Sequence, residues 1–280
     1  MAIAHSVNAV AFGARATVSE VLAAFGPGGD FSLVLPAWLL DNEPGGWDAG
    51  LAQIRKGGRG IASLLLTSWF SLAREECWPA EREALSRVVR AAAEVGAPYV
   101  YGTTGPAGHL EFDEMAGNLA QAVAPVRELA DSLGVRLLLE STNPLRTPIN
   151  AVFSFRDLLD LCDIAGTGPC VDLTAVASER DIAADLERHA ADIPVAQIGD
   201  LMPGTTVLGQ RAVPSDGDLP LERLLGALVR GGFDGVLDLE AFGPRVDEEG
   251  AAPAMLRGHG VLRAMLDQLT RSERNSTAES

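Results

Sequence analysis

Four oxygen-bearing side chains in the second half of the chain stand at or near the ends of short apolar segments. Glu140 ends "VRLLLE", Asp172 lies in "GPCVDL", Gln197 lies in "PVAQIG", and Glu240 ends "DGVLDLE". A buried carboxylate without a compensating partner is costly, and no lysine or arginine follows Glu140 within five residues. If these segments are neighbouring strands, three carboxylates converge and repel one another. A divalent cation bound among them would relieve that repulsion.

The segments that must position these residues belong to a pattern that repeats along the chain. Apolar, strand-like runs cover 5–12, 31–36, 61–67, 97–102, 135–140, 168–173, 194–199 and 234–240. Runs with helical i, i+3, i+4 apolar spacing lie between them, and a last one follows the eighth strand. Eight strands alternating with eight helices predict a single (β/α)8 TIM barrel, which typically needs about 250 residues. We assign residues 1–270 to this domain and the polar segment 271–280 to a disordered tail.

An open, doubly wound parallel sheet is the alternative fold. That fold would favour a glycine-rich phosphate loop after the first strand, and "AFGARATVSE" contains no G-x-G-x-x-G. The barrel is therefore preferred. In a barrel, the residues that end the strands share one rim, where active sites lie. This geometry brings the four oxygen donors together.

Charge and composition narrow the class of partner. The 280 residues carry a formal net charge of -16, which argues against binding to nucleic acid or to an anionic membrane surface. No apolar run reaches membrane-spanning length. The cysteines Cys77, Cys162 and Cys170 fit no zinc motif and indicate a reduced, cytoplasmic setting. We expect a small-molecule substrate as the partner, and a homodimer is compatible with such a barrel.

The closing segment "QRAVPSDGDLPLERLLGALVRGGFDGVLDLE" (210–240) resembles a known family. It is similar to the end of the sugar phosphate isomerase/epimerase group of the xylose isomerase-like barrel superfamily, and the resemblance covers about residues 135–245. It implies a (β/α)8 barrel with one divalent metal. The ligands that it implies here are Glu140, Asp172, Gln197 and Glu240.

Three positions depart from the pattern of that group. Gln197 stands where many members carry histidine, although the dehydroshikimate dehydratase branch resembles this chain in using glutamine. Ala175 replaces a histidine that some relatives use in catalysis, and Ser215 stands where glycine is common. An all-oxygen ligand set favours Mn²⁺ or Mg²⁺ over zinc, with Co²⁺ able to substitute.

Other residues are candidates for contact with a substrate. Arg211, in the long loop after the seventh strand, would clamp a hydroxyl, carboxylate or phosphate, unless it is a surface arginine. His109 follows the fourth strand and lies within reach of the rim. Trp38 and Trp69 follow the second and third strands, and either forms an apolar wall over a sugar or packs in the core.

Two further acidic residues lie beside the predicted ligands. Asp238 shares the face of Glu240 through the period of two in a strand, so it lines the barrel one layer below or pairs with a polar group of a neighbouring strand. Asp200 is either an outer anchor of the site or a loop cap.

The predicted chemistry is proton transfer at a carbon next to a carbonyl, with Glu140 and Glu240 as the two catalytic acids and bases. We therefore expect a divalent-metal-dependent sugar isomerase or epimerase. A dehydratase or lyase of the dehydroshikimate dehydratase type is one alternative, and a barrel that only binds a small molecule is another. A repair endonuclease of the same superfamily needs many histidine ligands, and this chain has four histidines.

Overall fold

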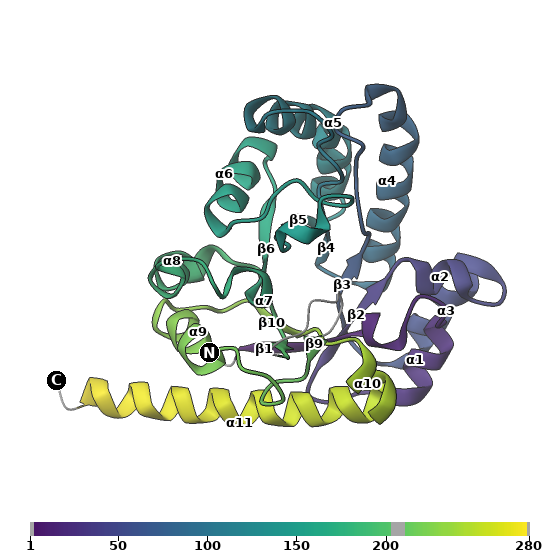
Figure 1. The fold of residues 1–280 in the computed structure, drawn as a ribbon. Helices are drawn as coiled ribbons and strands as arrows, with labels where there is room; N and C mark the ends of the chain where they lie inside the picture. The colour runs from purple at the N-terminus through teal and green to yellow at the C-terminus, as the bar shows by residue number, and fades with distance from the viewer. Residues whose placement is uncertain (1–2, 203–210, 279–280) are drawn as a thin grey trace.

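The computed structural model describes residues 3–202 and 211–278 (Figure 1). Parallel strands close into a barrel in the order β1-β10-β7-β6-β5-β4-β3-β2. These strands are β1 (Ala4–Asn8), β2 (Ser32–Pro36), β3 (Ile61–Leu65), β4 (Tyr99–Gly102), β5 (Arg136–Glu140), β6 (Gly168–Asp172), β7 (Val195–Ile198) and β10 (Val236–Leu239). Each overlaps one predicted strand segment, so the (β/α)8 barrel is confirmed.

Helices surround the barrel. The longer ones are α1 (Val18–Phe25), α3 (Gly46–Gly57), α4 (Trp78–Val95), α5 (Phe112–Ser132), α6 (Phe155–Ala165), α8 (Ile182–His189), α9 (Leu221–Arg230) and α11 (Ala251–Ala278). The short ones are α2 (Trp38–Asn42), α7 (Leu173–Val176) and α10 (Pro244–Glu249). Local chemistry sets their ends. For example, the Ser154 side chain accepts the N–H of Asp157 at the start of α6, and Gly166 ends that helix with a φ of 67°.

The first predicted strand is shorter than expected. Residues Ala9–Phe12 form a 3-10 helix, because the side-chain oxygen of Asn8 accepts the N–H of Val10 at 3.1 Å and turns the chain. After β7, the antiparallel pair β8 (Asp200–Leu201) and β9 (Arg211–Ala212) adds a small ribbon that the sequence did not predict.

The core has two parts. The larger part fills the layer between the barrel wall and the helices. The smaller part lies inside the barrel and consists of Val34, Ala62, Leu65, Tyr101, Leu138, Cys170 and Val195, with Trp38, Tyr99 and Val236 partly buried against it. On β5, β6 and β7 an apolar inward residue therefore precedes the oxygen donor by two positions. The barrel interior is thus packed with apolar side chains below a polar upper end.

The last helix differs from the prediction. Figure 1 shows α11 crossing the base of the view and projecting past α9. It continues to Ala278, well into the segment 271–280 that we expected to be a disordered tail. Polar composition suggested disorder, but no glycine or proline interrupts the helix after Gly260. Among the described residues, no helix is both long enough and apolar enough to span a bilayer.

A histidine pair links β1 to α11, and it predicts a pH dependence of stability. The Nδ1 of His5 lies 3.1 Å from the Nε2 of His259. Burial, aided by His259, lowers the pKa of His5 to about 4. The unfolded chain takes up this proton near the ordinary value of 6.5, so the contribution to stability is complete above pH 6.5 and is lost as the pH falls toward 4.

His5 is only partly buried, so solvent screening reduces the effect of its shift, and we expect His5 to lower the free energy of unfolding by on the order of 1–2 kcal/mol between pH 7 and pH 4.5. Urea denaturation at several pH values measures it. His5→Gln should flatten the curve relative to the unmodified chain. Equal pH dependence of the two proteins would contradict the assignment.

Candidate metal centre

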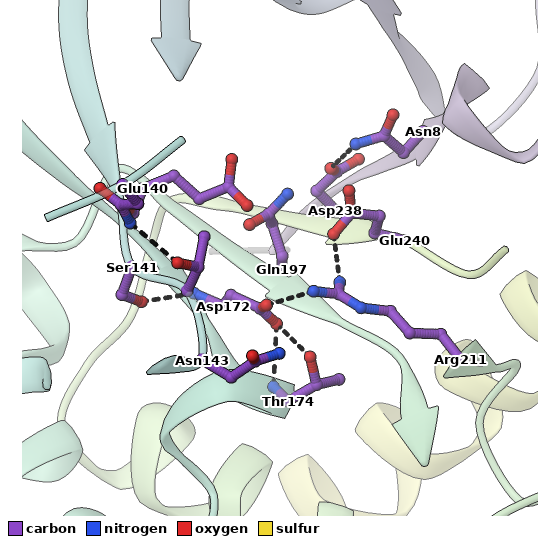
Figure 2. A network of polar contacts seen from close by, with 12 residues as sticks. Asn8, Glu140, Ser141, Asn143, Asp172, Thr174, Gln197, Arg211, Asp238 and Glu240 are labelled. Atoms are coloured by element: carbon purple, nitrogen blue, oxygen red, sulfur yellow. Dashed lines mark hydrogen bonds and ion pairs between the residues drawn. The ribbon is translucent and has the colours of Figure 1, made fainter. Parts of the chain in front are cut away.

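The three predicted carboxylates meet at the C-terminal end of the barrel (Figure 2). Glu140 ends β5, Asp172 ends β6, and Glu240 directly follows β10. One oxygen of each lies within 4.8 Å of one oxygen of the others. The side chains are nearly removed from water, since the exposed fractions of the residues are 8%, 0% and 5%. We call these three residues the acidic cluster.

Gln197 joins the acidic cluster from β7, as the sequence predicted. Figure 2 shows its amide between Glu140 and Asp238, with the nitrogen on the Asp238 side. The nitrogen donates to the Tyr101 hydroxyl at 3.2 Å. The oxygen Oε1 is buried and has no hydrogen-bond partner among the described residues. Leaving such an acceptor unsatisfied costs about 1–3 kcal/mol, which a cation ligated by that oxygen would offset. The donor set therefore fits a divalent cation.

The pKa shifts of the carboxyl groups also indicate that the site fits a cation. Burial raises the pKa of Glu140 well above its ordinary value, and the charges of Glu240 and Asp172 raise it further. Burial also raises the pKa of Glu240 to about 7, with Arg211 opposing and Asp172 adding to the shift. The raised pKa values show that it is costly for these carboxyl groups to be ionised at the same time. A bound cation would stabilise their ionised forms.

Arg211 lies inside the site. Its backbone N–H donates to Phe242 O at 3.0 Å, and its guanidinium forms ion pairs with Asp172 and Glu240. Burial disfavours the charged guanidinium, but the carboxylates of the acidic cluster raise its pKa above the ordinary value. Arg211 is therefore no free surface arginine. With all groups ionised, the acidic cluster and Arg211 carry a formal charge of -2, which one divalent cation would neutralise.

The loop residues around the site orient its ligands. Asp172 caps α7, because its Oδ1 accepts the N–H of Thr174 at 2.9 Å and the Thr174 hydroxyl at 2.6 Å. Its Oδ2 is directed to Arg211. Asp200 accepts the backbone N–H groups of Ser215, Gly217 and Leu219, so it acts as the loop cap that was one of its two predicted roles.

Ser215 has a φ of 76°, in the left-handed region that favours glycine. The position is the one at which the resemblance led us to expect glycine.

Two of the predicted substrate contacts, Trp38 and His109, lie in different surroundings. Trp38 is half-buried against the apolar interior of the barrel, and its indole N–H is buried without a partner in the described part of the chain. His109 is exposed on the loop after β4, and the structure shows no contact between it and the acidic cluster among the residues described.

Trp69 does not lie at the mouth. It is 1% exposed and packs in the layer between barrel and helices. Its backbone N–H donates to Thr103 O at 3.0 Å, which aligns this segment with the loop after β4. A Cβ placed on Gly102 would lie 2.4 Å from the indole nitrogen, so the ring covers the outer side of β4. Core packing is one of the two roles that the sequence predicted for Trp69, and it is the one seen here.

Sequence reasoning missed a group of polar residues below the acidic cluster. Ser6, Asn8 and Tyr101 are completely buried and point into the barrel, where Ser6 and Asn8 bond to Asp238 at 2.6 and 2.9 Å. Their signal was the period of two, since Ser6 and Asn8 are polar and lie on either side of the apolar Val7.

Comparisons with known proteins agree with this fold. A family model described as xylose isomerase-like TIM barrel matches residues 39–265. The structure of the IOLI protein with a bound zinc atom superposes with a TM-score of 0.78 at 15% identity, covering 95% of this chain and 99% of that one. L-ribulose 3-epimerase gives 0.76 at 16% identity, covering 99% and 98%.

A xylose isomerase domain protein from Alicyclobacillus acidocaldarius subsp. acidocaldarius gives a TM-score of 0.72 at 22% identity, covering 96% of this chain and 100% of that one. No curated protein matches the sequence. At these identities the superpositions support the fold, and the ligands rest on this chain's own geometry.

The acidic cluster predicts stoichiometric metal binding. Isothermal titration of chelator-treated protein with Mn²⁺ should show one ion per chain. Asp172→Asn should weaken the affinity by at least about 100-fold, the upper end of what loss of an outer partner costs. Glu43→Gln is a matched control, because Glu43 is a buried carboxylate bonded to Ser19 outside the acidic cluster. Undiminished affinity in Asp172→Asn would contradict the assignment.

Proposed function

The chain belongs to the xylose isomerase-like TIM barrel family, and we propose that it is a divalent-metal-dependent isomerase or epimerase of a sugar or related polyhydroxy ketone. The observation that supports this most is the position of two carboxyl groups. Glu140 and Glu240 come from β5 and β10, which are separated in the barrel by β6 and β7. They approach the same point from opposite sides (Figure 2). Two bases on opposite sides suit removal and return of a proton at one carbon.

The metal would be held by Glu140, Asp172, Gln197 and Glu240. Because all four offer oxygen, we propose Mn²⁺ or Mg²⁺, with Co²⁺ as a substitute. When bound, the ion supplies positive charge that stabilises the negative charge developing on a substrate oxygen as the neighbouring carbon loses its proton. The zinc in the IOLI structure is a property of that protein and does not assign the metal of this chain.

The chain's own residues carry the proton transfer. One of Glu140 and Glu240 removes the proton from carbon, and the other returns it on the opposite face. Arg211 holds Glu240 and Asp172 through its two ion pairs, which fixes the direction of the Glu240 carboxylate. Apolar Leu138 and Cys170 close the barrel beneath and exclude water from that side. The half-buried Trp38 is proposed as an apolar contact of the substrate at the mouth.

Two of the superposed structures support the substrate class. The superposed structures include L-ribulose 3-epimerase and D-psicose 3-epimerase with D-fructose present. Both proteins are ketose epimerases, and we extend that class to this chain as a proposal.

A dehydratase is the second candidate, and Gln197 favours it, because the dehydratase branch resembles this chain at that position. Elimination would begin with the same proton removal and then expel a β-hydroxyl group. Ala175, where some relatives carry a catalytic histidine, leaves α7 without an ionisable group at that position.

Solvent exchange separates these chemistries. Mn²⁺-loaded protein incubated with a panel of ketopentoses and ketohexoses in D₂O should incorporate deuterium next to the carbonyl, as seen by NMR or mass spectrometry. Loss of water from the product would instead indicate the dehydratase. A chain that binds these compounds but neither exchanges nor dehydrates them is a binding protein, and the proposed function is then wrong.

Glu140→Gln should lower the exchange rate by about 100–10,000-fold, the range that a positioned acid or base contributes. The variant should still fold, since glutamine has the same shape. Glu43→Gln should exchange at the rate of the unmodified protein. Full activity in Glu140→Gln would remove this residue from the chemistry.

A further inference from the structure

One fully buried carboxylate in the barrel lies outside the acidic cluster. Asp238 precedes Glu240 by two residues on β10 and is 0% exposed. Its register partners on the two adjacent strands are Ser6 on β1 and Gln197 on β7, and the inward positions two residues earlier on β7 and β10 hold Val195 and Val236. A carboxylate here is costly unless donors surround it. Ser6 Oγ donates to its Oδ1 at 2.6 Å, Asn8 Nδ2 donates to its Oδ2 at 2.9 Å, and the amide nitrogen of Gln197 lies on its side of the barrel (Figure 2).

The orientation of Asn8 is fixed from outside this network. Its oxygen accepts the backbone N–H of Val10 at 3.1 Å, so its Nδ2 must face the interior of the barrel. There the Nδ2 donates to both Asp238 and the Tyr101 hydroxyl, the latter at 2.7 Å. The oxygens of Asp238 and Tyr101 are consequently acceptors at this point of the lumen.

Gln197 meets these two acceptors. It is the register partner of Asp238 on the neighbouring strand β7. Its Nε2 donates to the Tyr101 hydroxyl at 3.2 Å and lies on the side of Asp238 (Figure 2). With the amide turned over, its oxygen would face the Asp238 carboxylate, which only accepts hydrogen bonds and would repel it, whereas the Tyr101 hydroxyl can accept or donate. The network therefore selects one orientation, in which Oε1 lies on the side of Glu140, away from Asp238 (Figure 2).

We propose that Asp238 is a positioning residue that, with Asn8 and Tyr101, locks the amide of Gln197 so that its oxygen is presented to the cation. This inference rests on the proposed metal site. It explains why a carboxylate is buried where apolar packing would suffice. It also explains how an amide, which has a donor end and an acceptor end, serves as a reliable ligand.

Asp238→Asn tests the lock. Asparagine is uncharged and carries an NH₂ group in place of one carboxylate oxygen, so it no longer repels the Gln197 oxygen and can donate to it. Gln197 can then turn to accept that N–H, which withdraws its oxygen from the cation. Isothermal titration should show Mn²⁺ affinity weakened by about 10–100-fold, as for other outer partners of a ligand. Glu43→Gln should leave the affinity unchanged, and thermal melts should show both variants folded.

The same substitution made in a Gln197→Glu variant distinguishes a positioning role of Asp238 from a general contribution to stability. In Gln197→Glu the ligand is a carboxylate that presents oxygen in either orientation, and it is repelled by Asp238. There, Asp238→Asn should not weaken Mn²⁺ binding and should strengthen it through relief of repulsion. An equal loss in both backgrounds would show a merely structural role and overturn the inference, and so would no loss in the native background. If Asp238→Asn does not fold, Tyr101→Phe removes the other acceptor and should show a smaller loss with the same dependence on background.

Failure of the proposed function is distinguishable in the same experiment. If the unmodified chain does not bind Mn²⁺, the metal site is wrong and the inference falls with it. If the unmodified chain binds Mn²⁺ and Asp238→Asn binds it equally, only the positioning role is wrong.

Discussion

Mutual repulsion among three buried carboxylates is the constraint on which the upper end of this barrel depends. Glu140, Asp172 and Glu240 place oxygens within 4.8 Å of one another with almost no access to water. In such surroundings like charges interact far more strongly than on a surface. Arg211 neutralises one of the three negative charges through its ion pairs to Asp172 and Glu240. The two charges that remain match one divalent cation.

In the barrel, the residues that pack the interior and the residues that donate oxygen occupy different inward positions along the strands. Apolar inward residues fill the lower interior, and oxygen donors stand two positions further along β5, β6 and β7. On β10 the pattern changes, because Asp238 occupies an inward position below Glu240. The hydrogen bonds of Asp238 continue through Asn8 and Tyr101 to Gln197, which is the one ligand whose side chain has both a donor end and an acceptor end.

The strands and the residues at their ends could be predicted from the sequence, whereas the paths of the loops could not. Strand ends in a parallel barrel share one rim, so the positions of Glu140, Asp172, Gln197 and Glu240 followed from periodicity alone. Trp69 lies in a loop whose path is set by backbone bonds to the next loop, which no period encodes.

Arg211 was placed in the right loop, but its ion pairs depend on how β9 returns over the barrel. The buried partners of Asp238 needed side-chain geometry, although their alternation on the first strand was visible. α11 continues to Ala278, beyond residue 270, where we predicted the folded domain to end.

The most direct test of this account is the anomalous scattering of Mn²⁺ in a crystal grown with the ion. The account predicts one peak at the acidic cluster, with oxygens of Glu140, Asp172, Gln197 and Glu240 within about 2.5 Å, as expected for a divalent cation bound by oxygen. Two results would contradict it. One is a peak elsewhere while the acidic cluster holds no metal, and the other is an ion at the acidic cluster that the side-chain oxygen of Gln197 does not ligate.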